Sequence, residues 1–209
     1  MNNNLKIYKN TIIYSFYWII HGILLMIIFN FDKLKIFNWI NSYKHEFITL
    51  VLSYLTYLGH AYIFIFGMIF VIYKKKYIIP LTISCIISVL IVSIMKKYLF
   101  IHYIRPSIID NAININNYIF NIQYNSSFPS GHAIVAFSFW NIINFILIDI
   151  NIYITSYLFI LSSLISYSRI YLSHHFYIDI YIGSIIGSII SIFSWYLSSL
   201  IIKNTQSRT

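Results

Sequence analysis

The sequence predicts an all-α protein, a polytopic membrane bundle of about six transmembrane helices, and three observations support this prediction. The chain has 209 residues, of which 59% are hydrophobic and only 9% are charged. Soluble domains contain about 45–50% apolar and about 25% charged residues, so the chain lies outside that class. Its mean hydropathy is +0.77. Apolar runs of about 20 residues, long enough to cross a bilayer as a helix, recur along it.

Six apolar segments are the predicted spans, and they cover residues 11–30, 48–72, 77–95, 132–150, 152–168 and 179–201. The first segment follows Lys6 and Lys9, as in a signal peptide, but its apolar stretch is too long for one and no small-x-small cleavage site follows. Gly183 and Gly187, four residues apart, predict close packing of the last helix on a neighbour. We therefore expect a single integral-membrane domain over residues 1–209.

The basic residues predict which side of the membrane each loop faces. With six spans both termini share one side, and we take it as cytoplasmic. Seven basic residues then flank the spans there: Lys6, Lys9, Lys74, Lys75, Lys76, Lys203 and Arg208. The other face holds three, Lys33, Lys35 and Lys44, if the basic residues of the clusters below are set aside; with them counted, the two faces are level. This bias follows the positive-inside rule and predicts a bacterial inner-membrane protein whose site faces outward.

The first polar cluster at the edge of a predicted span is KKYLFIHYIRP, residues 96–106. Lys96, Lys97 and Arg105 would bring fixed positive charge to the mouth of the bundle. There Arg can bind a phosphate bidentately, and Lys acts as a point charge. The alternative for the lysine pair is a basic flank whose side chains reach from the end of a span toward water.

The second cluster is FPSGHA, residues 128–133, at the start of the fourth span. A helix N-terminus favours an anion through its backbone N–H groups and its dipole. Gly131 lets the backbone approach a ligand closely. Ser130 can cap the helix or donate to a phosphate oxygen, and His132 follows at the helix start. An ordinary N-cap with an interfacial histidine is an equal alternative.

The third cluster is SRIYLSHHFYID, residues 168–179. If the last span begins near residue 175, His175 and Asp179 share one helix face. Asp179 would then accept a hydrogen bond from one imidazole nitrogen and leave the other free as a nucleophile or base. A structural pair competes with this interpretation, but Arg169 upstream favours an anion site. His174 would point elsewhere on such a helix.

Together the clusters offer cations, a helix N-terminus and two separate histidines, a set suited to metal-free phosphoryl transfer. One histidine would attack phosphorus, the other would protonate the leaving oxygen, and the cations would stabilise the equatorial oxygens. The chain has only five acidic residues and one cysteine, so carboxylates suited to Mg²⁺ and a multi-cysteine metal site are both excluded. Zinc held by His132, His175 and Asp179 is an alternative that the surrounding Arg and Lys residues disfavour. We expect no cofactor.

The ordered clusters resemble the type-2 phosphatidic acid phosphatase superfamily, in its membrane lipid phosphatase branch. That family's pattern has three parts: Lys, six residues, Arg-Pro; then Pro-Ser-Gly-His; then Ser-Arg, five residues, His, three residues, Asp. Residues 129–132 and 168–179 match the second and third parts without a gap. The first part departs, because seven residues separate Lys97 from Arg105 and Tyr98 stands at the expected lysine position. The resemblance covers residues 97–179.

The resemblance implies a role for each matching residue. His175 would be the nucleophile that forms a phosphohistidine, with Asp179 orienting it and His132 as the general acid. The phosphate would be bound by Arg105, Arg169, Ser130, Gly131 and Lys97. The activity implied is metal-independent hydrolysis of a lipid phosphate or diphosphate on the non-cytoplasmic leaflet. Undecaprenyl pyrophosphate, phosphatidylglycerol phosphate, phosphatidic acid and lipid A are the substrates expected.

Two alternatives stay open at this point. A lipid phosphotransferase would use the same phosphohistidine and pass the group to another lipid. A non-catalytic lipid-phosphate binder or transporter would need the cations but not two histidines with an orienting aspartate. A haloperoxidase shares such an anion site but conflicts with six spans. The net charge of +9 flanks apolar segments, which indicates anionic membrane lipids and no nucleic-acid partner. No obligate protein partner is expected.

Overall fold

The structure, a computed structural model, describes residues 21–23, 26, 30–107, 126–147 and 152–206. All the regular structure in these ranges is helical, which confirms the predicted fold class. Most of the first predicted span, 11–30, lies outside the described residues.

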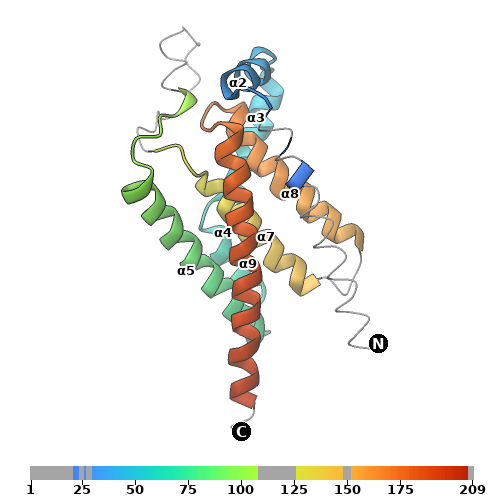
Figure 1. Ribbon diagram of the computed structural model, residues 1–209. Helices are drawn as coiled ribbons and strands as arrows, with labels where there is room; N and C mark the ends of the chain where they lie inside the picture. Colours follow the sequence, from blue (N-terminus) through green and yellow to red (C-terminus); the bar gives the residue numbers. More distant parts are fainter. Residues whose placement is uncertain (1–20, 24–25, 27–29, 108–125, 148–151, 207–209) are drawn as a thin grey trace.

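The described helices follow one another along the chain, with irregular turns between them (Figure 1). They are α2 (Lys33–Ser42), α3 (Glu46–Leu55), the 3₁₀ turn η1 (Thr56–Gly59), α4 (Ile63–Phe70), the 3₁₀ turn η2 (Lys75–Tyr77), α5 (Ile78–Ile94), the π-helix η3 (Met95–Leu99), α7 (Gly131–Leu147), α8 (Ile152–Tyr171) and α9 (Tyr177–Gln206).

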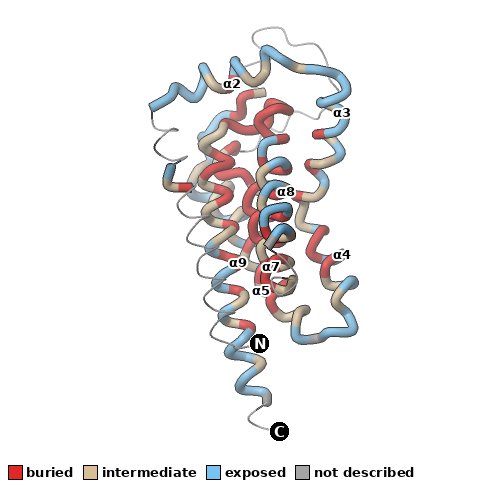
Figure 2. The backbone as a smooth tube through the Cα atoms, turned by 90° about the vertical axis from the view of Figure 1, so that its right-hand side faces the viewer, coloured by how far each residue is buried: buried red, intermediate tan, exposed pale blue. Residues whose placement is uncertain are grey.

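Helix α7 lies at the centre of the bundle and packs against α5, α8 and α9. Every residue of its segment 133–139 is buried, and Figure 2 shows the buried positions gathered around it. The predicted close packing of α9 is present: a Cβ at Gly183 would lie 2.8 Å from the Ser130 carbonyl oxygen and 3.0 Å from the Ala133 Cβ. Because glycine has no side chain, the two backbones meet where the site is built.

The predicted span 48–72 is not one straight helix. Its two parts, Glu46–Gly59 and Ile63–Phe70, meet at an angle of 65°. Among the described residues, Ile78–Leu99 and Tyr177–Thr205 are long and apolar enough to cross a membrane, and this bent pair would be a third span. Apolar side chains such as Ile65, Phe66 and Phe70 are exposed, as expected against lipid. The predicted number of six spans is therefore not confirmed.

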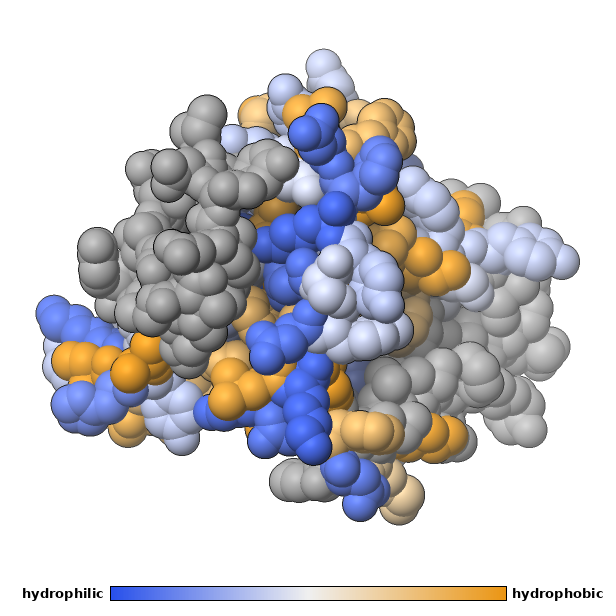
Figure 3. Space-filling view, turned by 90° about the horizontal axis from the view of Figure 1, so that it is seen from above, coloured by the Kyte–Doolittle hydropathy of each residue, from blue (hydrophilic) through white to orange (hydrophobic). Residues whose placement is uncertain are grey.

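Helix α2 lies across one end of the bundle, over the loop that joins α8 to α9 (Figures 1 and 2). The Asp32 carboxylate caps it by accepting from the N–H groups of Leu34 and Lys35 at 2.8 and 3.0 Å. Phe37 packs edge-on against Phe176, with ring centroids 5.7 Å apart. Seen from this end, hydrophilic side chains form a band across the surface (Figure 3). The site lies beneath this end.

Candidate active site

The turn between α8 and α9 sets the position of the third cluster. Helix α8 ends at Tyr171, so Arg169 belongs to its last turn and not to the predicted loop. The N–H of His174 donates to the Arg169 carbonyl at 2.9 Å, and that of Ser173 to the Ile170 carbonyl at 2.9 Å. With Ser173 at φ 60°, this is a Schellman C-cap. It reverses the chain so that the next residue, His175, turns back toward the bundle.

The left-handed residue of this cap is held from α2 and from the turn after it. Lys44 Nζ donates to the Ser173 hydroxyl at 2.9 Å, and that hydroxyl donates to Asn41 Oδ1 at 2.9 Å. The Asn41 amide also donates to the Ile170 carbonyl at 3.4 Å. Because a non-glycine residue at positive φ is strained, these contacts stabilise a turn that the sequence alone would not favour.

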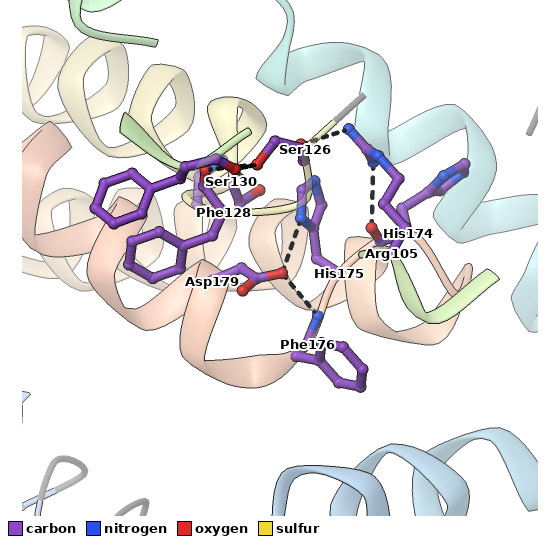
Figure 4. A network of polar contacts seen from close by, with 10 residues as sticks. Arg105, Ser126, Phe128, Ser130, His174, His175, Phe176 and Asp179 are labelled. Carbon is purple, nitrogen blue, oxygen red and sulfur yellow. Dashed lines mark hydrogen bonds and ion pairs between the residues drawn. The ribbon is translucent and has the colours of Figure 1, made fainter. Parts of the chain in front are cut away.

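His175 and Asp179 are in contact, as the sequence predicts, but by a different route. Helix α9 begins at Tyr177, so His175 precedes the helix and does not share one of its faces. Its Nδ1–H donates to Asp179 Oδ2 at 3.3 Å, and both side chains are buried. The same oxygen accepts from the backbone N–H of Phe176 at 3.1 Å, which is one half of a capping box at the start of α9 (Figure 4). The cap therefore fixes the carboxylate that orients the imidazole.

The second cluster joins this site through the backbone. The Ser130 N–H donates to the Asp179 carbonyl at 3.0 Å, and the Ser130 hydroxyl accepts from the Ala133 N–H at 3.5 Å, a long N-cap bond for α7. Gly131 opens the helix, and a Cβ there would lie 3.2 Å from Val92 Cγ1. The start of α7 therefore lies against Asp179, the partner of His175.

Two arginines lie buried at the site. The Arg105 guanidinium donates from Nη1 to the His174 carbonyl at 3.2 Å and from Nη2 to the Ser126 carbonyl at 3.5 Å (Figure 4). Arg169 donates from Nη1 to the Thr56 hydroxyl at 3.0 Å. Its Nε–H is buried and has no hydrogen-bond partner within the described part of the chain. A buried guanidinium with an unused donor is suited to an anion such as a phosphate.

The structure places Lys96, and not the expected Lys97, among these cations. Lys96 is half-buried and interacts electrostatically with Arg105, Arg169 and Asp179. The Lys97 side chain is exposed, and its Nζ lies over the Tyr98 ring, 5.4 Å from the centroid. The π-helix η3 explains the difference, because its five-residue turn changes which side chain faces inward. The Phe100 N–H closes this turn on the Met95 carbonyl at 2.8 Å.

His132 has a partner that the sequence did not suggest. Its Nε2 lies 3.2 Å from Nε2 of His60, at the break between η1 and α4. Thr56, the partner of Arg169, belongs to the same turn. A histidine inside an apolar segment is a functional signal at membrane depth, and this rule marks His60 along with His21. No comparable signal marks Thr56.

Groups of the site outside the membrane-spanning helices have shifted pKa values. Burial lowers the pKa of His175 well below its usual value, and the charges of Arg105 and Arg169 lower it further. The imidazole is therefore neutral at pH 7, the state in which its lone pair can attack. Burial, followed by the same arginines, lowers the pKa of His174 to about 3. Burial lowers the pKa of Arg105, while Asp179 opposes that shift.

The described residues contain no group of three or more His, Cys, Asp or Glu side chains arranged to hold a metal ion. His132, His175 and Asp179 lie instead among cations, since Arg105, Arg169 and Lys96 all act on His175. This donor set suits an anion better than a zinc ion.

Comparison with known proteins identifies the family. The sequence profile of the PAP2 superfamily matches residues 51–203, a range that includes His60, Lys96, Arg105, Ser130, His132, Arg169, His175 and Asp179. The chain belongs to the PAP2 superfamily. No curated protein sequence matches it significantly.

Two solved structures resemble the chain. The crystal structure of Aquifex aeolicus LpxE is 30% identical, with a TM-score of 0.64 over 77% of this chain and 93% of that one. The first transmembrane PAP2-type phosphatidylglycerolphosphate phosphatase from Bacillus subtilis is 18% identical, with a TM-score of 0.63 over 93% and 98%. The second match shows the fold alone. The apolar helices Ile78–Leu99 and Tyr177–Thr205, in a fold shared with a transmembrane protein, identify this PAP2 protein as an integral membrane protein.

Proposed function

We propose that this PAP2 protein is a membrane lipid phosphatase that works through a phosphohistidine on His175. One observation carries the proposal: a neutral imidazole, oriented by Asp179, lies among Arg105, Arg169 and Lys96 with a second histidine close by. The family and the two structural relatives support the phosphatase class. The site residues belong to one integral-membrane domain.

These positions support a two-step mechanism. His175 attacks phosphorus with its Nε2 while Asp179 holds the Nδ1–H. The bond from phosphorus to the lipid oxygen breaks, and His132 gives that oxygen a proton, so the lipid alcohol leaves. Water then attacks the phosphohistidine and loses its proton to His132, which releases phosphate and restores both histidines. No metal is needed in either step.

The cations stabilise the charge that develops on the phosphoryl oxygens. Arg169 contributes the Nε–H that has no partner among the described residues, and Arg105, held on the His174 carbonyl, acts with it on the nucleophilic imidazole. Lys96 takes the part that the family pattern gives to its first lysine. Ser130 and the Gly131 N–H, at the N-terminus of α7, complete the phosphate site.

The substrate we propose is a lipid phosphomonoester or diphosphate. The candidates are undecaprenyl pyrophosphate, phosphatidylglycerol phosphate, phosphatidic acid and lipid A; the relative from Bacillus subtilis is itself a phosphatidylglycerolphosphate phosphatase. The site lies at the end of the bundle that α2 crosses, whereas Lys74 and Lys76, at the turn η2, and Lys203, near the C-terminus, lie toward the other end and belong to the larger basic group (Figures 1 and 2). By the positive-inside rule, we place this end on the periplasmic face of a bacterial inner membrane.

The test is phosphate release from a panel of these lipids in detergent, with and without EDTA. Wild-type protein should release phosphate in both conditions, and His175→Ala should release none. His174→Gln is the matched control, because it alters the adjacent histidine but keeps the backbone carbonyl that accepts from Arg105. Unchanged release by His175→Ala would refute the proposal, and loss of activity with EDTA would refute the metal-free mechanism. Phosphate appearing on an acceptor lipid without free phosphate would identify a phosphotransferase instead.

A further inference from the structure

His60 lies against the proposed general acid from an element outside the family pattern. The two Nε2 atoms of His60 and His132 are 3.2 Å apart, and the rings meet edge to face with centroids 4.4 Å apart. These residues are 72 positions apart in the chain. The contact therefore depends on how the bent span packs against α7.

The break in the bent span is built to bring His60 this close. Gly59 ends η1, and a Cβ there would lie 3.2 Å from the His132 carbonyl oxygen and 2.8 Å from Ile165 Cγ2. His60 itself is extended, at φ −84° and ψ 149°, so the helix stops and its side chain leaves the helical path. A larger residue at position 59 would press against the His132 carbonyl and separate the two segments. A helix that continued straight through residue 60 would carry the His60 side chain away from His132.

Two tyrosines hold the His60 ring in place. The ring stacks on Tyr57 with centroids 5.7 Å apart and on Tyr62 with centroids 5.3 Å apart, at interplanar angles of 25° and 11°. Stacking fixes the ring plane, and the remaining freedom is limited by the contact with His132. The imidazole is thus pre-oriented with its Nε2 toward the acid.

We propose that His60 is a positioning residue that shares a proton with His132, a role that rests on the proposed function. Two imidazoles joined through Nε2 need one donor and one acceptor, so each ring fixes the tautomer of the other. When the pair takes up one extra proton, the resulting imidazolium donates a charge-assisted hydrogen bond to its neutral neighbour. The pair then titrates as a unit.

The proton balance fits both half-reactions. Because Nε2 of His132 is bonded to His60, the protonated pair gives the leaving lipid oxygen the proton on His132 Nδ1 and is left as two neutral rings. The water that attacks the phosphohistidine returns one proton to the pair. A neutral acceptor stabilises the protonated pair because two cations, Arg169 from α8 and Lys96 from η3, also act on His132. The remaining imidazoles nearby, His174 and His175 in the loop after α8, are neutral at pH 7.

The test compares His60→Phe, which keeps a stacking ring but has no nitrogen, with His60→Gln, which keeps an acceptor oxygen. His102→Phe is the control, because it removes an exposed imidazole outside the site. In His60→Phe the protonated acid loses its acceptor, so the alkaline limb of the kcat profile should move to lower pH by about one unit. The rate with a lipid alkyl phosphate should fall about tenfold or more, whereas an aryl phosphate, whose leaving group needs no proton, should lose far less. His60→Gln should lie between.

An unshifted profile in His60→Phe, or equal losses with alkyl and aryl leaving groups, would reduce His60 to a packing residue. A second measurement uses the wild-type protein alone. In ¹⁵N-histidine-labelled protein, the His60 and His132 rings should take up one proton together, and independent titration of the two would overturn the inference. This readout needs no turnover. If wild-type protein releases no phosphate, the proposed function fails while the coupling between the rings is still decided.

Discussion

Asp179 Oδ2 accepts two hydrogen bonds at once, from Nδ1–H of His175 at 3.3 Å and from the backbone N–H of Phe176 at 3.1 Å. The first bond orients the proposed nucleophile, and the second caps the helix that carries the carboxylate. One oxygen atom therefore both caps α9 and orients the imidazole. A substitution at position 179 can be chosen to keep the cap and weaken the bond to His175.

Asp179→Asn should leave the fold largely intact and remove most of the activity. The amide oxygen can still accept from the Phe176 N–H, but it is a weaker and uncharged partner for the His175 ring. We expect kcat to fall about 10³-fold or more, with a small change in thermal unfolding temperature. Rapid-quench detection of the phosphohistidine would assign the loss to its formation. An Asp179→Asn enzyme with wild-type kcat would contradict the orienting role.

The low pKa of His175 predicts an activity that persists into mildly acid solution. Because burial and then Arg105 lower that pKa, the imidazole stays neutral and nucleophilic as the pH falls below 6.5. The acid limb of kcat/KM should therefore lie below pH 6.5. Arg105→Gln removes one of the charges that disfavour the imidazolium, so its acid limb should move to higher pH, in addition to a lower rate.

Arg105→Lys is the control for this shift. It keeps the positive charge but loses the two-donor geometry toward the His174 and Ser126 carbonyls. Its acid limb should stay near that of the wild type while its rate falls. If Arg105→Gln and Arg105→Lys gave the same limb, charge would not be the cause.

Lys96 and Lys97 form a matched pair for the third prediction. Lys96 interacts with Arg105, Arg169 and Asp179, whereas the exposed Lys97 lies over Tyr98. Lys96→Ala should raise KM and lower kcat/KM about tenfold or more, since a point charge near the phosphate is lost. Lys97→Ala should stay within about twofold of the wild type, as a surface charge does. Both variants should be measured with one lipid phosphate at constant ionic strength. A larger loss of kcat/KM in Lys97→Ala than in Lys96→Ala would show that Lys97 is the lysine that binds the phosphate.

The contiguous parts of the site could be predicted from the sequence because local rules govern them. The contact of His175 with Asp179 and the cap at Ser130 each span only a few residues, so spacing identifies the right residues, although His175 precedes α9 and does not lie on its face. The lysine could not be assigned by counting, because the π-helix adds a residue to the turn that carries it. Hydropathy ended the predicted span at residue 168 and so placed Arg169 in a loop. In the structure α8 continues to Tyr171.

The contacts of the bent span were beyond sequence reasoning for a different reason. Hydropathy shows residues 48–72 as one apolar run and does not reveal the 65° bend within it. His60 reaches His132 across 72 residues and Thr56 reaches Arg169 across 113 residues. Such pairings depend on tertiary packing, which periodicity along one segment does not report.

The bond from Arg169 to Thr56 carries the last prediction. Thr56→Val keeps the shape of the side chain but leaves Nη1 of a buried arginine without its acceptor. A lost hydrogen bond to a charged group is worth about 1.5–3 kcal/mol, so the guanidinium should lose its fixed orientation. Inhibition by inorganic phosphate should then weaken about tenfold, while kcat changes less than the inhibition constant.

Thr56→Ser keeps a hydroxyl and should behave as the wild type. Thr49→Val, which removes a hydroxyl that donates to the carbonyl of His45 at the N-cap of α3, should change neither phosphate inhibition nor kcat. Equal phosphate inhibition in Thr56→Val and wild type would show that α8 alone orients Arg169.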